Sequence, residues 1–181
     1  MKSQILLILS ILAMNLGFAQ GNKSETIKLK STPKSVSRNE KLAPGKPITN
    51  FEFKDMNGNI YTLASLKGKV VVLNFWFSTC VPCIEEVPEL NMLVEKYKDM
   101  NVVFLSPTFE NEETAMKFIV KHKLTTNVSP NNKAYTDDMG FIYYPANIIL
   151  DKDGYIFKTF SGSVPDFGKV FTNELDFLLK M

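Results

Sequence analysis

Residues 70–88 read VVVLNFWFSTCVPCIEEVP and contain both cysteines of the chain. The first eight residues are almost all apolar and rich in β-branched and aromatic types, which is typical of a central strand buried on both faces. From Val81 onward, apolar residues recur at three- and four-residue steps as far as Tyr97, and this spacing predicts a helix. Pro82 falls in the first helical turn, where a missing N–H costs nothing. The stretch therefore predicts a strand, a Cys-x-x-Cys turn and a helix in direct succession.

This position gives the two cysteines different chemistry. Cys80 lies where the strand ends and the helix begins, so unpaired backbone N–H groups and the positive end of the helix dipole face its sulfur. Both lower the pKa of the thiol, and only the thiolate attacks a disulfide. Cys83, one turn later, is expected to be more enclosed and to act as the resolving thiol. Glu86 shares the helix face of Cys83, and a partly desolvated carboxylate there can accept or return the Cys83 proton.

These residues also have simpler, non-catalytic interpretations: a structural disulfide, a zinc site and exposed carboxylates. A structural disulfide is disfavoured, because closing so short a loop stabilises a fold by only about 2 kcal/mol, against ~4.7 kcal/mol for a loop of about 100 residues. A zinc site needs four ligands, and beyond the cysteine pair the chain offers only one histidine, His122. We therefore expect no metal and no cofactor. Glu85 and Glu89 are interpreted as exposed carboxylates that the helix dipole favours, and this remains the alternative for Glu86.

The N-terminal residues have the anatomy of a secretory signal. Lys2 precedes an apolar run over residues 5–14, and Gly17 and Ala19 place small residues before a cleavage point. We predict a signal peptide over residues 1–19 and export to the periplasm. The alternative is an uncleaved membrane anchor, but the apolar run is shorter than the roughly 20 residues of a bilayer span.

The rest of the chain predicts one α/β domain over residues 47–181, after a flexible polar lead-in over residues 20–46. A β-hairpin around the Asn57-Gly58 turn opens the domain. Further strands are expected at 102–105, 125–128, 146–150 and 155–160, and helices at 112–122 and 165–179, while 131–140 is irregular or a short helix. This order predicts a mixed central sheet flanked by helices, with the hairpin as an N-terminal extension.

Composition argues against a nucleic-acid partner. The chain has 21 basic and 19 acidic residues, and 45% of its residues are hydrophobic. The basic residues are scattered, apart from a lysine cluster in the lead-in without interleaved aromatic residues.

The redox stretch, together with YPANIILDKDG at residues 144–154, resembles the thioredoxin superfamily, specifically its exported branch of TlpA/ResA-like disulfide reductases. The resemblance implies a thioredoxin fold over residues 42–181, with Cys80 and Cys83 as the redox pair. It also implies roles for three further residues: Pro145 as the cis-proline against the pair, Tyr144 as a backbone contact for an extended substrate, and Glu86 as the acidic residue of the exported branch. Trp76 is interpreted as a packing residue that also forms a wall of the substrate site, with packing alone as the favoured alternative. Asn74 stands where thioredoxin commonly has a buried Asp, so proton handling is expected to pass to Glu86 or to water.

Together these observations predict a thiol–disulfide oxidoreductase that reduces disulfides of exported proteins. We expect it to be a monomer that a membrane thiol electron donor re-reduces, with a reduction potential nearer about −270 mV than about −120 mV. Two alternatives stay open. A peroxiredoxin-like thiol peroxidase would need Thr three residues before its cysteine, where this chain has Phe77. A non-catalytic thioredoxin-like module would only bind extended peptides.

Overall fold

The computed structural model describes residues 39–181, and the predicted signal peptide and most of the predicted lead-in lie outside them. The elements in chain order are η1 (Glu40–Leu42), β1 (Glu52–Lys54), β2 (Ile60–Thr62), β3 (Val70–Phe75), α1 (Val81–Tyr97), β4 (Val102–Pro107), α2 (Glu112–His122), β5 (Asn127–Ser129), α3 (Lys133–Met139), β6 (Ala146–Leu150), β7 (Ile156–Ser161) and α4 (Phe167–Lys180). Within residues 39–181, no helix has both the length and the apolar character needed to cross a membrane.

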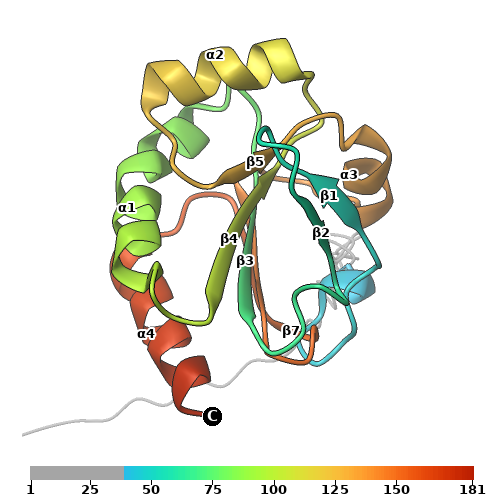
Figure 1. Ribbon diagram of the computed structural model, residues 1–181, viewed down its shortest axis with the longest axis vertical. Helices are drawn as coiled ribbons and strands as arrows, with labels where there is room; N and C mark the ends of the chain where they lie inside the picture. The colour runs from blue at the N-terminus through green and yellow to red at the C-terminus, as the bar shows by residue number, and fades with distance from the viewer. Residues whose placement is uncertain (1–38) are drawn as a thin grey trace, which may run out of the picture. The chain divides into compact units, whose positions relative to one another are not determined.

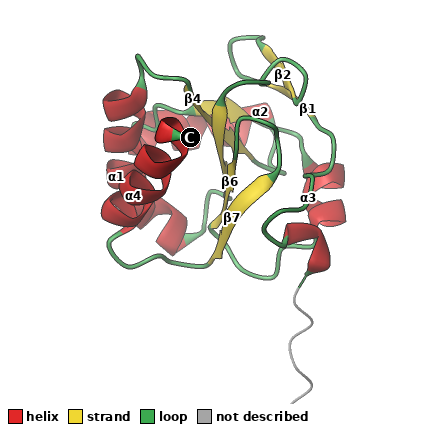
Figure 2. Ribbon diagram, turned by 90° about the horizontal axis from the view of Figure 1, so that it is seen from below, coloured by secondary structure: helices red, strands yellow, loops and turns green. Residues whose placement is uncertain are grey.

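The central sheet has the strand order β5-β4-β3-β6-β7. β3 pairs in parallel with β4 and antiparallel with β6, so the sheet is mixed, as predicted. α1 and α4 lie on one side of it, and α3 and the β1–β2 hairpin lie on the other (Figures 1 and 2). Because both faces of β3 are covered, all six of its residues are buried.

The side chains of β3 alternate between two separate hydrophobic cores. Val70 and Val72 belong to the core shared with α1, α2 and α4, which also contains both cysteines. Val71, Leu73 and Phe75 belong to the other core, together with residues of the hairpin and α3. This period of two is what a strand between two layers requires. The apolar run in the sequence is therefore explained by its place in the middle of the molecule.

The predicted hairpin forms, as a two-stranded antiparallel sheet of its own. Its turn contains Gly58 with φ +87°, a conformation that favours glycine. The buried Asp55 carboxylate accepts the backbone N–H groups of Asn57 and Asn59 at 2.9 and 2.8 Å. These side chain–backbone bonds stabilise the turn, and the Met56 backbone N–H donates to the Val128 carbonyl of β5 at 3.0 Å, which links the turn to the main sheet.

The ordered domain starts earlier than the predicted boundary at residue 47. The Asn39 amide donates to the Met139 carbonyl at 2.6 Å, and the Thr159 hydroxyl donates to the Leu42 carbonyl at 2.9 Å. The backbone of residues 45 and 46 exchanges hydrogen bonds with Ile156 at the start of β7. This polar segment is therefore ordered by hydrogen bonds, most of them from its backbone. A prediction based on the spacing of apolar residues does not detect such bonds.

Two C-terminal elements also differ in detail from the prediction. The segment described as irregular or a short helix contains α3, which ends at Gly140 with φ +62°. The last helix begins at Phe167 rather than Pro165, and Asp166 before it has φ +52° and makes no capping bond with its side chain.

The missing cap of α4 comes from another helix. The Glu89 carboxylate of α1 accepts the backbone N–H of Gly168 in the first turn of α4. A Cβ at Gly168 would lie 2.9 Å from the same carboxylate oxygen, so glycine permits the close approach. Glu89 is therefore half-buried and structural, and the interpretation of it as an exposed carboxylate is wrong.

We expect Glu89→Ala to lower the free energy of unfolding by about 1 kcal/mol, because an N-terminal N–H of α4 loses its acceptor. Urea unfolding at neutral pH measures the change. Glu85→Ala is the matched control, since Glu85 is an exposed carboxylate on the same helix and its loss should change stability by less than about 0.5 kcal/mol. Equal losses in both variants would contradict the capping role.

Candidate active site

The two cysteines form a disulfide at the junction between β3 and α1. Their Cα atoms are 5.3 Å apart. Each residue is 4% exposed, so in this oxidised state Cys83 is not more enclosed than Cys80, in contrast to the prediction. Cys80 is the N-cap of α1, and its Sγ accepts the backbone N–H of Cys83 at 3.3 Å. The predicted succession of strand, Cys-x-x-Cys turn and helix is confirmed. A sulfur atom placed at a helix N-terminus with an N–H directed at it is in an environment that favours the thiolate.

A cis peptide bond joins Tyr144 to Pro145, as the resemblance implied. β6 begins immediately afterwards, and its Ala146 pairs with Phe75 at the end of β3. In this antiparallel register, Pro145 lies at the same end of the sheet as the chain that leaves β3 for Cys80. The sheet thus brings together two segments that are about sixty residues apart in the sequence.

Trp76 does not serve as an exposed wall for a substrate. Its side chain is 2% exposed, its ring stacks on Phe118 with 4.0 Å between centroids, and its Nε1–H donates to the Ser106 carbonyl at 3.3 Å. The structure therefore supports the packing interpretation of Trp76 and not the wall of a substrate site: Trp76 packs beneath α2, in the core that also holds the cysteines.

Glu86 is a buried carboxylate on the same helix as the cysteines. It is 8% exposed, and its Oε1 accepts the Asn147 side-chain amide at 2.6 Å. Its Oε2 is buried and has no hydrogen-bond partner among the described residues. Burial raises the pKa of Glu86 to about 8; the Asn147 hydrogen bond opposes this shift, and the charge of Glu89 adds to it. A carboxyl group with this pKa exchanges its proton near neutral pH.

Asn147 is itself held by a line of polar side chains across the sheet. Its Oδ1 accepts the Asn74 amide at 2.8 Å, between residues that are direct cross-strand partners in β3 and β6. Asn74 Oδ1 accepts the Ser106 hydroxyl at 3.4 Å, and Ser106 accepts the Thr126 hydroxyl at 2.6 Å. The orientation of Asn147 is thus fixed from the side opposite Glu86.

Water has a route towards Glu86. A pocket of about 140 Å³ is lined by Glu86 together with Pro82, Glu85, Glu89, Ser163, Val164 and Phe167. Pro82 lies between the two cysteines, so this opening lies next to the redox turn.

A second carboxylate positions the segment just before Cys80. Glu110 accepts the backbone N–H of Ser78 at 2.9 Å and the Ser78 hydroxyl at 2.7 Å. The two bonds fix the backbone two residues before Cys80, through an acidic residue that follows β4.

The comparisons with known proteins agree with this geometry. A family model described as Redoxin matches residues 43–173. This chain belongs to the redoxin family.

Relatives of this redoxin carry names that describe an activity. The thiol-disulfide oxidoreductase ResA of Bacillus cereus is 33% identical over 132 residues, which cover 70% of this chain and 74% of that protein. The thioredoxin-like protein YneN of Bacillus subtilis is 31% identical over 118 residues, or 64% of this chain and 69% of YneN. The solved thioredoxin domain of a thiol-disulfide oxidoreductase from Bacteroides vulgatus has a TM-score of 0.65 and 25% identity, with 76% of this chain and 99% of that domain covered.

These findings confirm the predicted thioredoxin-type fold and the predicted class of enzyme, a thiol–disulfide oxidoreductase. They favour it over the thiol peroxidase and the non-catalytic module.

Two polar residues of this redoxin were missed by sequence reasoning. Asn147 is a polar residue in an otherwise apolar strand, and that contrast was a usable signal. Glu110 offered no signal, because its partner Ser78 is 32 positions away and no local pattern links the two residues. His122 lies against the Phe118 ring, with 4.6 Å between centroids, and is apart from the redox pair. Among residues 39–181, no three His, Cys, Asp or Glu side chains form a group suited to hold a metal ion.

Proposed function

We propose that this redoxin reduces disulfides of exported proteins, with Cys80 as the nucleophile and Cys83 as the resolving thiol. The observation that carries the proposal is the N-cap position of the Cys80 sulfur, which accepts the Cys83 N–H at the start of α1. That environment stabilises negative charge on one sulfur of the pair. The predicted signal over residues 1–19 supports a periplasmic location.

The reaction begins with the reduced pair. The Cys80 thiolate attacks one sulfur of the partner's disulfide; an S–S bond forms to Cys80, and the partner's other sulfur leaves as a thiolate and takes up a proton. Cys83 then attacks Cys80 and displaces the partner's first sulfur as a second thiolate, which is also protonated. Two electrons and two protons pass to the partner, and the Cys80–Cys83 disulfide remains, which is the state of the present structure.

Glu86 is proposed to handle the proton in the second step. Cys83 must lose its proton before it attacks, and Glu86 lies one helical turn further along the same face of α1. Because burial raises the pKa of Glu86 to about 8, the carboxylate can take the Cys83 proton near neutral pH, which is the condition for efficient general-base catalysis. The protein then returns to the reduced state through a membrane thiol electron donor, and we propose that it works as a monomer.

Trapping tests this assignment of roles. Cys83→Ala removes the resolving thiol, so partners should accumulate as mixed disulfides on Cys80 in cells that express the full chain. The adducts should disappear on treatment with dithiothreitol, and mass spectrometry of the released proteins identifies the substrates.

The matched control is the double variant Cys80→Ser/Cys83→Ala, which has no thiol and should trap nothing. If Cys80→Ser alone trapped partners through Cys83 as well as Cys83→Ala does through Cys80, the order of attack proposed here would be reversed.

A further inference from the structure

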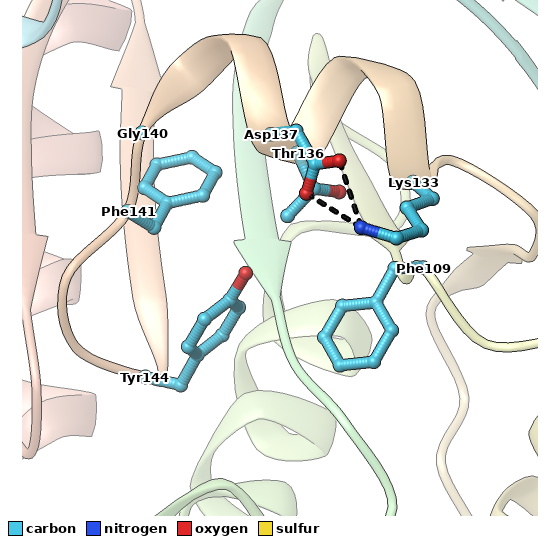
Figure 3. A pocket seen from close by; sticks show the side chains of 7 residues that line it. All are labelled: Phe109, Lys133, Thr136, Asp137, Gly140, Phe141 and Tyr144. Carbon is cyan, nitrogen blue, oxygen red and sulfur yellow. Dashed lines mark hydrogen bonds and ion pairs between the residues drawn. The ribbon is translucent and has the colours of Figure 1, made fainter.

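A second, larger pocket opens beside Tyr144, the residue that precedes the cis-proline. Figure 3 shows the residues that line it, and its volume is about 370 Å³. Its lining combines three aromatic side chains with residues of α3 and its C-terminal end: Phe109, Phe141, Tyr144, Lys133, Asp137 and Gly140. None of these residues has a role in the proposed proton or electron transfer.

The walls of this pocket are aromatic. The Tyr144 ring lies 6.2 Å from the Phe109 ring and 6.0 Å from the Phe141 ring between centroids, both edge-on. Phe109 is 37% exposed, so one wall is open to solvent. Rings arranged in this way present both faces and edges to an incoming apolar or aromatic group.

The charges at this pocket cancel each other. Lys133 Nζ lies 3.0 and 2.8 Å from the two carboxylate oxygens of Asp137, four residues later in α3 (Figure 3). Because these are the one cation and the one anion of the lining, its net charge is zero. An uncharged group therefore fits this site better than an acidic or a basic one.

Phe77 links the lining of this pocket to the redox turn. The Tyr144 ring also lies 5.3 Å from the Phe77 ring, and the Phe77 carbonyl accepts the Cys80 backbone N–H at 3.1 Å. Two neighbouring residues, Ile142 and Tyr143, are 60% and 59% exposed, which extends the apolar surface beyond the opening. Exposed apolar surface beside a reactive site is characteristic of an interaction surface.

We propose that this pocket, called here the Tyr144 pocket, receives an aromatic or large aliphatic side chain from the partner polypeptide, next to the cysteine that Cys80 attacks. The proposal rests on the proposed function and adds a substrate preference to it. Proteins whose disulfide cysteines are flanked by large apolar residues are thus the favoured substrates.

Synthetic peptides with an intramolecular disulfide test the preference. Phe, Ala, Glu or Lys is placed next to one cysteine, and glutathione disulfide serves as the reference without such a side chain. Second-order rate constants for the reduced protein are measured by stopped flow; the fluorescence of Trp76, the only tryptophan, reports on the core that contains the cysteines. We expect the Phe peptide to react about tenfold faster than the Ala peptide, and the Glu peptide no faster than the Ala peptide.

Two variants locate the preference in the Tyr144 pocket. Phe109→Ala should reduce the Phe-to-Ala ratio to about twofold or less, whereas Phe177→Ala, which removes an exposed ring from α4, should leave the ratio unchanged. Lys133→Ala leaves Asp137 unpaired at the opening, so the rate constant of the Lys peptide should rise relative to that of the Ala peptide. This last effect does not depend on the loss of a ring.

The outcomes separate the two proposals. If no disulfide reacts, glutathione disulfide included, the proposed function fails. If all peptides react at equal rates, or if Phe109→Ala keeps the full Phe-to-Ala ratio, the oxidoreductase stands and the Tyr144 pocket is not a substrate site.

Discussion

Cys80→Ser is expected to lower the rate of disulfide exchange by at least about a thousandfold, the largest effect of any single substitution in this protein. The reason is chemical, because only a thiolate attacks a disulfide at a useful rate and a serine hydroxyl does not ionise near neutral pH. Reduction of glutathione disulfide by the purified protein, coupled to a chemical dithiol, measures the loss.

The fold should survive this substitution. Serine is among the preferred N-cap residues, and its hydroxyl can accept the same Cys83 N–H that the Cys80 sulfur accepts. The disulfide that is lost closes only a short loop, so its contribution to stability is modest. Circular dichroism and a thermal unfolding curve close to that of the reduced wild type would show that the loss is one of chemistry.

Alkylation of the reduced wild type gives an independent measure of the same assignment. The pKa of the Cys80 thiol is expected to lie below that of a free cysteine, so iodoacetamide should label Cys80 rapidly at neutral pH and Cys83 slowly. Peptide mapping distinguishes the two sites. Equal, slow labelling of both would mean that the helix N-terminus does not activate either sulfur, and the proposed mechanism would have no nucleophile.

The elements that could be predicted from the sequence are those with a short-range signal. The apolar run of β3 reports burial on both faces, because each face contributes every second residue. The spacing between Cys83 and Glu86 reports a shared helix face, and both side chains are indeed buried. Local periodicity is enough for such features, since the helix or strand geometry alone fixes the relation between the residues.

What could not be predicted depends on contacts between distant segments. Glu89 caps a helix that starts 78 positions later, and Asn147 meets Glu86 from a strand 61 positions away. The sequence around Glu89 and around Asn147 gives no indication of the distant residue that each contacts. For Trp76, the sequence left both packing and a wall of the substrate site open, and the stacking on Phe118 of α2 shows that it is a core residue.

Glu86→Gln is expected to slow the resolving step by about a hundredfold, because the variant cannot accept the Cys83 proton. The mixed disulfide between Cys80 and a substrate should persist correspondingly longer, which quenched-flow gel analysis measures. In the wild type the rate of this step should rise with pH up to about 8, the pKa of Glu86, and this inflection should be absent from the variant. Glu85→Gln, an exposed neighbour on the same helix, should leave both the rate and the pH profile unchanged.

Although Glu86→Gln should slow the reaction, it should increase the stability of the folded protein at pH 8. Burial raises the pKa of Glu86 from 4.5 to about 8 in the folded protein, so between these two pH values the unfolded chain gives up a proton that the folded protein retains. Stability therefore falls as the pH rises through this window, by up to about 1.4 kcal/mol per pH unit, and the decrease ends near pH 8. Below pH 4.5 the carboxyl group is protonated in both states and has no such effect.

Urea unfolding of the oxidised protein at a series of pH values tests this sign. The variant should lack the fall between pH 4.5 and 8, so its stability relative to the wild type should increase from pH 4.5 to pH 8, and at pH 8 it should be the more stable of the two. A variant that is slower and more stable would mean that the buried carboxylate is kept for its chemistry at a cost to the fold. If Glu86→Gln were slower and also less stable at pH 8, Glu86 would be a structural residue, and the loss of rate would follow from a distorted site.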